Sequence, residues 1–540
     1  MLITVAAKKL DLGRSYDWYD YYSIQPNELA RSDVSLVGCY FWYSLASHAL
    51  PRTTSFLGFI LPRDLKSHTL PPPTQASTSS GSGCRSLDPA DELKADLVQV
   101  QSIRSGLGQD EPLSTSVVAK ATSSTDLNLN YNATFTESIE PFTIYVKEEF
   151  LQQTRLKASL TRFVDEYAQP DLIDGPSSAF ARRVAAYWAD TYDWRQIEAS
   201  INAKLPQFTT LVHPSPSPAN HTLPVPLHFV HRRSNRSDAI PLLFVHGWPG
   251  SFLEVESLLA QLTNPPNASL PAFHVVAPSI PGYGFSPSPQ ARGFGYRAAG
   301  STFHGLMLKL GYPEYVFQGG DAGDFINRYA AHDFPDSVMA GLSNFWIVPP
   351  TQEDLDKFRR GESTDDEKYI INLLGKFFSK DWGYGQIQQT RPLKLAHAMT
   401  DSPVGLAMWI YDSVVAGVPD PSIWTEELLI TWTMMHWIPG PYGAFSLYKN
   451  GAADGAISTT GINLLPYVSQ PIAISEFPYD LWYHTPLEWA RRGGNVLYRT
   501  VHETGGHFAS LTNPELLLAD IWKFFGKAGV VSGAEQEEVE

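Results

Sequence analysis

Gln318-Gly319-Gly320-Asp321-Ala322-Gly323 is the segment from which the fold can be inferred. It follows a strand-like run at residues 315–318 (YVFQ) and precedes a helical pattern at 322–331. A glycine, any residue, a nucleophile, any residue and a second glycine form the nucleophile elbow, a turn that lifts the central side chain above the sheet edge. The glycines permit such a strained turn. An aspartate that only caps the next helix fits this motif equally well.

A second motif favours the elbow over the helix cap. His246-Gly247-Trp248-Pro249-Gly250 directly follows the continuous apolar run 240–245 (IPLLFV). In an α/β-hydrolase, one donor of the oxyanion hole lies at this turn, and the residue after the nucleophile supplies the other. We therefore assign the backbone N–H groups of Trp248 and Ala322 to the predicted oxyanion hole. The alternative is a generic Gly/Pro turn after a strand.

A candidate general base lies near the C-terminus. Gly505-Gly506-His507-Phe508 follows the predicted strand 496–500, and this fold places its base on a loop after a late strand. His502 is the alternative. We favour His507, because the preceding glycine pair permits a loop conformation and a close approach that the strand-adjacent His502 lacks.

The acid that orients this histidine is expected after the preceding strand. Asp480 lies just beyond the predicted strand 472–475 and 27 residues before His507. Such a carboxylate orients the imidazole and stabilises its charged form without reacting itself. Glu476 is the alternative acid.

Strands and helices alternate through the second half of the chain, which indicates a mostly parallel sheet covered by helices on both faces. The predicted fold class is α/β, an α/β-hydrolase fold with a helical lid, preceded by an α-rich N-terminal domain and a largely disordered extension. Strands are predicted at residues 144–146, 227–231, 240–245, 273–277, 315–318, 344–348, 472–475 and 496–500. Helical spacing of apolar residues occurs at 164–167, 179–189, 322–331 and 514–525.

These patterns divide the chain into segments. The predicted boundaries are a mostly disordered extension (1–138), an α-rich domain (139–226), an α/β core in two parts (227–349 and 466–530), a helical lid (350–465) and an acidic tail (531–540).

The extension is recognised by its composition. Residues 71–83 (PPPTQASTSSGSG) form a Pro/Ser/Gly linker, and residues 114–138 are rich in Ser, Thr and Asn without periodicity. A small accessory domain at 15–62 is the alternative. The two cysteines of the chain, Cys39 and Cys84, lie in this region and have no metal-ligand spacing.

Charge and hydropathy argue against nucleic-acid binding and against a membrane-spanning helix. The chain has 40 Lys and Arg against 56 Asp and Glu, a net charge of −16, which argues against nucleic acid. No stretch of about 18 uncharged apolar residues occurs, so no membrane-spanning helix is predicted. The apolar run 34–46 is too short to span. We expect a cytoplasmic or peripherally membrane-associated protein.

Taken in order, these motifs resemble the microsomal-type epoxide hydrolase family, which couples an N-terminal helical domain to an α/β-hydrolase domain. The likeness covers roughly residues 141–525. The matching segments are PFTIYV (141–146), LTRFVDE (160–166), YWADTYDWR (187–195), LPQFTT (205–210), HGWPGSF (246–252), VVAPSIPGYGFS (275–286), LMLKLGY (306–312), QGGDAG (318–323), DSPVGLAMWI (401–410) and GGHFASLTNPELLLADI (505–521).

The resemblance implies a role for each candidate residue. It makes Asp321 the nucleophile, His507 the base and Asp480 the acid, and it adds two lid tyrosines. These are Tyr384, eight residues before Pro392, and Tyr448 in LYKN. Ala322 is a departure, because relatives usually carry tryptophan there. Since only its N–H is needed, the chemistry is expected to survive while the pocket shape differs.

The activity that the resemblance implies is the opening of a lipophilic epoxide to a vicinal diol. The expected partners are the epoxide and water, with no cofactor and no metal, and a homodimer is left open. Two alternatives are another Asp-nucleophile hydrolase, such as a haloalkane dehalogenase, and a catalytically inactive binding protein. A dehalogenase would need halide-binding donors in place of the tyrosine pair, so the placement of Tyr384 and Tyr448 relative to Asp321 discriminates best.

Overall fold

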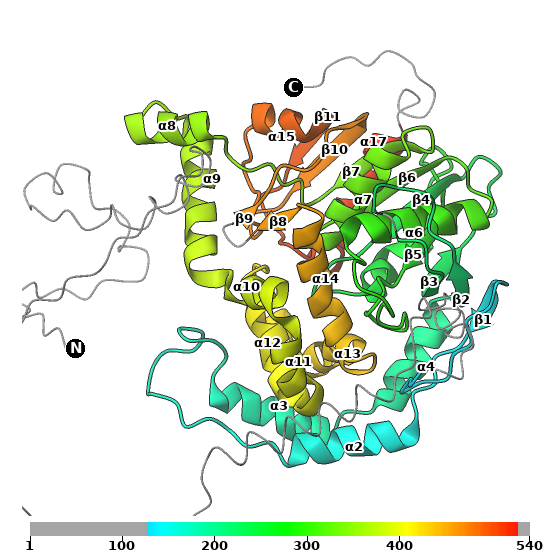
Figure 1. Cartoon of the computed structure of the whole chain (residues 1–540), viewed down its shortest axis with the longest axis vertical. Helices are drawn as coiled ribbons and strands as arrows, with labels where there is room; N and C mark the ends of the chain where they lie inside the picture. The colour runs from blue at the N-terminus through cyan, green and yellow to red at the C-terminus, as the bar shows by residue number, and fades with distance from the viewer. Residues whose placement is uncertain (1–126, 220, 459–460, 527–540) are drawn as a thin grey trace, which may run out of the picture. The chain divides into compact units, whose positions relative to one another are not determined.

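The computed structural model of the chain describes residues 127–219, 221–458 and 461–526 (Figure 1). The predictions made for residues 1–126 and for the acidic tail at 531–540 lie outside the described residues. These include the linker, the alternative accessory domain and both cysteines.

A nine-stranded sheet forms the centre of the described part of the chain. Its order is β1-β2-β3-β5-β4-β6-β7-β10-β11, antiparallel from β1 to β5 and parallel from β5 to β11. The strands are β1 (Glu140–Phe142), β2 (Gln207–Val212), β3 (Val225–Arg232), β4 (Ile240–Val245), β5 (Phe273–Pro278), β6 (Tyr315–Gly319), β7 (Val338–Ser343), β10 (Val468–Glu476) and β11 (Gly494–Val501).

The register of the parallel strands brings the loops that carry the motifs to one edge. Val245 at the end of β4 pairs with Gly319 at the end of β6, and Gly319 pairs with Ser343 at the end of β7. Because the carboxyl ends of these strands are level, the loops that follow them emerge side by side.

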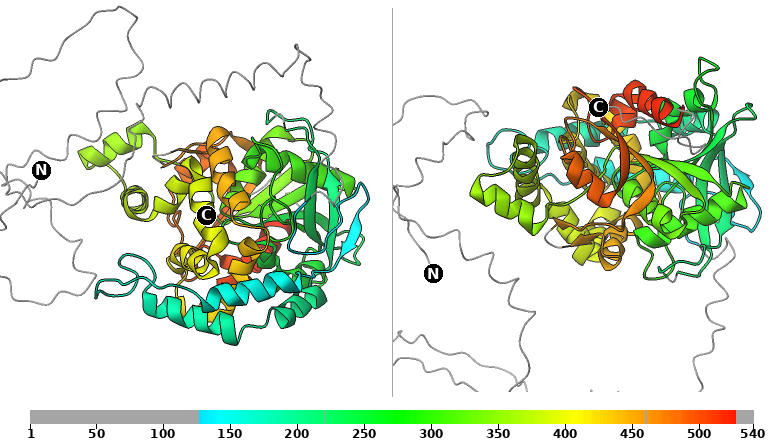
Figure 2. Two further views of the ribbon diagram at one scale, coloured as in Figure 1. Left: turned by 60° about the horizontal axis from the view of Figure 1, so that its bottom comes forward. Right: turned by 90° about the horizontal axis from the view of Figure 1, so that it is seen from above.

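Helices cover both faces of this sheet, as predicted. They are α5 (Glu256–Thr263), α6 (Tyr296–Lys309), α7 (Ala322–Asp333), α15 (Leu487–Gly493), α16 (Ala509–Thr512) and α17 (Pro514–Gly526). Helix α6 packs on α7, and α5 packs on α17. Seen from above in Figure 2, the red helix α17 lies on one side of the sheet and the green helices α6 and α7 lie on the other.

Two strand predictions are wrong, and one strand of the central sheet was missed. Residues 344–348 are not in a strand but in a buried segment that follows β7. In β7, a Cβ on Gly341 would lie 2.0 Å from the ring of Phe317, and this position of the strand therefore requires glycine. The glycine interrupts the run of apolar residues in β7. The missed strand is β2, and the predicted strand at 144–146 is replaced by β1 and a single bridge at Val146.

A helical insertion lies between β7 and β10. It comprises α8 (Gln352–Arg360), α9 (Asp365–Lys376), the π-helix η6 (Phe377–Asp381), α10 (Gly383–Thr390), α11 (Pro392–Asp401), α12 (Pro403–Val415), η7 (Pro421–Ile423), α13 (Glu426–Trp437), α14 (Tyr442–Ala453) and the hairpin β8 (Ile457–Ser458) and β9 (Gly461–Ile462). Local sequence sets several of its boundaries. Thr351 and Thr364 form capping boxes with Asp354 and Glu367 at the starts of α8 and α9.

The N-terminal helices pack against this insertion. They are α2 (Glu148–Ser159), α3 (Ser178–Asp190) and α4 (Trp194–Lys204), and α2 and α3 contact α12 and α13. Figure 1 shows α2 and α3 running beneath the yellow lid helices. A buried hydrogen bond of 2.8 Å joins Trp437 Nε1 on α13 to Thr154 Oγ1 on α2.

Residues 164–167 and the start of the folded domain differ from the sequence prediction. Val164 and Tyr167 lie in the loop after α2 and are 72% and 86% exposed, so the helix predicted at 164–167 is wrong. Tyr131 and Phe135 are buried, and the Tyr131 hydroxyl donates to Phe285 O at 2.8 Å. Packing therefore begins before residue 139, where the sequence placed the start of the folded domain. No helix in the described ranges is both long and apolar enough to cross a membrane.

Candidate active site

The predicted elbow forms between β6 and α7, with Asp321 at its tip. Asp321 has φ 50° and ψ −128°, a conformation that a non-glycine residue adopts only when its surroundings enforce it. A Cβ on Gly323 would lie 2.1 Å from the carbonyl oxygen of Val245, so the turn can approach β4 only with glycine at that position. The elbow thus holds Asp321 at the edge where the β4 loop also emerges.

The β4 loop meets the Asp321 carboxylate directly. The backbone N–H of Trp248 donates to Asp321 Oδ1 at 2.7 Å. Ala322 is the first residue of α7, so its N–H has no carbonyl partner within the helix. The two predicted oxyanion donors therefore flank the aspartate, one in contact with it and one at the helix N-terminus that follows it.

His507 lies between two carboxylates. Its Nδ1 is 3.1 Å from Asp480 Oδ1, and its Nε2 is 3.7 Å from Asp321 Oδ2. Burial lowers the pKa of His507, but the charges of Asp480 and Asp321 and the hydrogen bond to Asp480 outweigh it, so the pKa lies well above its usual range. The two carboxylates therefore favour the protonated form of the resting imidazole.

Both rival residues are engaged elsewhere. His502 Nε2 lies 2.7 Å from Asp520 Oδ2, and Glu476 forms a two-pronged ion pair with Arg499 at 2.8 and 2.9 Å. Neither side chain joins the contacts between Asp321, His507 and Asp480. The structure therefore brings together the residues preferred from the sequence and leaves their rivals apart.

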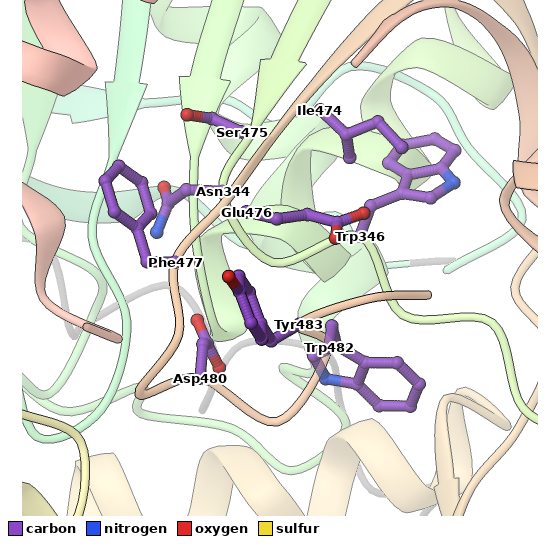
Figure 3. Close-up of a pocket in the computed structure, with 9 residues that line it drawn as sticks. All are labelled: Asn344, Trp346, Ile474, Ser475, Glu476, Phe477, Asp480, Trp482 and Tyr483. Atoms are coloured by element: carbon purple, nitrogen blue, oxygen red, sulfur yellow. The ribbon is translucent and has the colours of Figure 1, made fainter. Parts of the chain in front are cut away.

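A small cavity lies behind Asp480. It measures about 10 Å³ and is lined by Asn344, Trp346, Ile474, Ser475, Glu476, Phe477, Asp480, Trp482 and Tyr483 (Figure 3). Asp480 Oδ1 accepts a hydrogen bond from Leu481 N at 2.6 Å, whereas its buried Oδ2 has no partner among the described residues. A space of this size holds about one water molecule, which would satisfy the second oxygen.

The two lid tyrosines meet over Trp248. The ring of Tyr384 on α10 stacks on the indole at 5.0 Å, and the ring of Tyr448 on α14 meets it edge-on at 5.9 Å. The two phenol rings are 6.1 Å apart. Burial, reinforced by the charge of Asp321, raises the pKa of both phenols, so both keep their protons. Two neutral O–H donors from different lid helices therefore lie beside the loop that touches Asp321.

Two polar residues near the site were not found from the sequence. Asn344 Nδ2 donates to the backbone oxygen of His507 at 3.4 Å, and its Oδ1 accepts from Gln318 Nε2 at 2.9 Å, so it links the base loop to β6. Glu254 follows the β4 loop, and its charge state is sensitive to both Asp321 and His507. The only sequence signal for Glu254 is an acidic residue six positions after Trp248. In the described part of the chain, no cluster of three or more His, Cys, Asp or Glu is arranged to hold a metal ion.

The site can be compared with known proteins. The family pattern described as "Epoxide hydrolase N terminus" matches residues 139–255, and the alpha/beta hydrolase fold pattern matches 240–344. Epoxide hydrolase 1 of Sus scrofa is 30% identical, over 72% of this chain and 89% of its own length. The chain belongs to the microsomal-type epoxide hydrolase family. The resemblance inferred from the motifs is thereby confirmed, and the chain is an enzyme of the epoxide hydrolase class.

Other epoxide hydrolases extend the likeness. Juvenile hormone epoxide hydrolase 2 of Ctenocephalides felis is 28% identical, over 71% of this chain and 85% of its own length. The solved structure of Aspergillus niger epoxide hydrolase is 28% identical with a TM-score of 0.60, covering 72% of this chain and 96% of that one. The juvenile hormone epoxide hydrolase structure from the silkworm Bombyx mori is 25% identical, with a TM-score of 0.60 and coverages of 72% and 94%. The predicted α/β-hydrolase fold is therefore confirmed.

Proposed function

We propose that this epoxide hydrolase opens a lipophilic epoxide to a vicinal diol through a covalent ester on Asp321. The observation that carries the proposal is the chain of contacts from Trp248 N–H through Asp321 and His507 to Asp480, at 2.7, 3.7 and 3.1 Å. This arrangement supplies a carboxylate nucleophile, a base beside it and an acid that orients the base.

The first step forms the ester. One oxygen of Asp321 attacks an epoxide carbon, the carbon–oxygen bond of the ring breaks, and the ring oxygen takes a proton from Tyr384 or Tyr448. Because both phenols are neutral, either can donate that proton. The extra proton on His507 then restores the tyrosine.

Loss of the Asp321 charge prepares the second step. In the resting site, Asp321 and Asp480 both favour the protonated imidazole. The ester is neutral, so His507 loses one of its two anionic neighbours and becomes a better proton acceptor. The site therefore gains its base only once there is an ester to hydrolyse.

The second step breaks the ester with water. His507 takes one proton from water as the hydroxide adds to the Asp321 carboxyl carbon, and the N–H groups of Trp248 and Ala322 stabilise the oxyanion. When the ester bond breaks, the acid formed on Asp321 gives its proton to the leaving alkoxide. The diol departs, and a charged Asp321 again faces a protonated His507.

A lipophilic substrate is supported by the aromatic surroundings of the tyrosine pair. The Trp382 ring lies 5.3 Å from Tyr384 and 6.2 Å from Tyr448, and Phe377 and Phe378 pack on Trp382 at 5.6 and 5.8 Å. The same pair of O–H donors favours an epoxide over a haloalkane, because a leaving ring oxygen needs a proton and a halide does not.

Isotope transfer from solvent tests the proposal. Repeated turnovers in ¹⁸O-water are expected to place label in the peptide that contains Asp321, because each ester is cleaved at the carboxyl carbon. His507→Gln should trap the ester as a persistent mass increase, whereas His502→Gln, the matched control, should not. Label in the diol with none in the protein would refute the covalent route.

A further inference from the structure

Glu254 is an acidic residue that the proposed reaction does not use. It lies on the 3-10 helix η5 (Phe252–Val255), directly after the turn that carries Trp248. Its side chain bends back toward that turn, because a Cβ on Gly250 would lie only 1.7 Å from Glu254 Oε1. Glycine at position 250 therefore makes room for this carboxyl.

The carboxyl has an unsatisfied oxygen in the neighbourhood of the reacting groups. Glu254 Oε1 is buried and has no hydrogen-bond partner among the described residues. Glu254, Asp321 and His507 each keep some accessible surface, although Gly247 and Trp248 around them are buried. A buried polar atom without a partner is costly, so an acceptor kept in this state needs an explanation.

Glu254 is neutral at neutral pH. Burial is the main cause that raises its pKa to about 8, and the negative charge of Asp321 acts in the same direction. The charge of His507 and the backbone amides of Gly247 and Ser251 lower the pKa and oppose this shift. Both reacting side chains are thus close enough to affect the protonation of Glu254. A neutral carboxyl offers an acceptor oxygen without adding a negative charge next to a developing oxyanion.

The space between Asp321 and His507 suits a bridging molecule. His507 Nε2 and Asp321 Oδ2 are 3.7 Å apart, beyond the usual length of a direct hydrogen bond. A water molecule in a buried site needs two to four polar partners. The imidazole and the Asp321 carboxyl supply two of these partners. Glu254 Oε1 can supply a third, because it is a buried acceptor without a hydrogen-bond partner among the described residues.

We propose that Glu254 Oε1 holds the water that hydrolyses the Asp321 ester. This inference rests on the proposed function. One hydrogen of the water points to His507 Nε2 and is transferred there as the oxygen bonds to the Asp321 carboxyl carbon. The other hydrogen is held by Glu254 Oε1 and stays on the new hydroxyl, while Glu254 keeps its own proton throughout.

Two substitutions in the full chain test this role. Glu254→Met keeps the length of the side chain and removes the acceptor, whereas Glu254→Gln keeps a neutral acceptor oxygen. With styrene oxide as the probe, rapid mixing and quenching followed by intact mass separates the formation of the ester from its breakdown. We expect Glu254→Met to slow breakdown by about 10- to 100-fold and leave formation unchanged, and Glu254→Gln to stay within about threefold of the wild type.

Thermal unfolding separates this role from a structural one. Because Glu254→Met removes an unpaired buried carboxyl, its Tm is expected to equal or exceed that of the wild type. Ester breakdown at the wild-type rate in Glu254→Met overturns the inference. So does equal slowing of both steps with a lowered Tm, or failure of that variant to fold, because a carboxyl that only holds water is not needed for folding. If the wild type forms no ester, the proposed function itself fails.

Discussion

Replacing Asp480 by asparagine removes the charge that faces His507 and leaves the shape of the side chain almost unchanged. Asp480 Oδ1 is 3.1 Å from His507 Nδ1, and the Asp480 side chain is only 3% exposed. Two unit charges at this distance interact by about 5 kcal/mol at an effective dielectric constant of about 20. The imidazolium formed during ester hydrolysis therefore loses its main electrostatic support.

This loss is expected to fall on one step. Since each 1.4 kcal/mol corresponds to about tenfold in rate, removing most of 5 kcal/mol slows ester breakdown by about 10³- to 10⁴-fold. Ester formation does not protonate His507 and is expected to change by less than about tenfold. The Asp480→Asn variant should therefore accumulate the ester, visible as a mass increase after quenching within a single turnover.

Glu476→Gln is the matched control for this experiment. Glu476 ends β10, four positions before Asp480, and is held by Arg499 and by the backbone N–H of His484 rather than by His507. Glutamine there is expected to lower the Tm, because Arg499 loses its partner, but to leave the ratio of the two steps unchanged. If Asp480→Asn clears the ester at the wild-type rate, or if Glu476→Gln traps it equally well, the assignment of the acid is wrong.

Three further predictions follow from the site and its surroundings. Tyr384→Phe and Tyr448→Phe should each slow ester formation by about 10²- to 10³-fold without affecting breakdown, and full turnover by the double variant would contradict this. The folded protein keeps the Glu254 carboxyl protonated to about pH 8, whereas an unfolded chain releases that proton near its ordinary pKa of 4.5, so this carboxyl makes stability fall as pH rises between these values. Glu254→Gln should therefore raise the Tm more at about pH 8 than at about pH 5, and equal gains would disprove the pKa shift. Deleting residues 1–126 is expected from their composition to leave a folded, active enzyme. Deleting 1–138 also removes two buried aromatic residues and should cost about 3–5 kcal/mol of stability for each. Equal urea midpoints for the two truncated proteins would contradict this.

The parallel core could be predicted because its strands are continuous apolar runs between turn motifs. The run 240–245 is β4 itself, and the elbow marks the junction of β6 and α7. The segment 344–348 has the same apolar composition but is a buried loop. Burial alone makes such a run apolar, so composition does not distinguish a buried strand from a buried loop. The sequence prediction therefore placed the strand at 344–348, whereas β7 lies at Val338–Ser343.

The site could be predicted only where a backbone motif marks it. Asp321 and Trp248 lie in glycine turns with a recognisable spacing, and His507 follows a glycine pair. Tyr384 and Tyr448 came from resemblance, because nothing in a helix signals which tyrosine faces a distant turn. Glu254 shows the limit most clearly: its relation to Asp321 and His507 depends on a side chain that bends back past Gly250, and no pattern along the chain encodes that.

The interface between the N-terminal helices and the lid cannot form until both have been synthesised. Thr154 and Trp437, joined by a buried hydrogen bond, are separated by 283 residues. At about 5–20 residues per second, the ribosome makes the second partner roughly 14 to 57 s after the first. Until then the apolar face of α3, including Phe180, Val184 and Trp188, lacks α13, one of the two lid helices that pack against α3. Part of this apolar face is therefore uncovered on the nascent chain until the ribosome has made α13, and such exposed surface favours aggregation and chaperone binding.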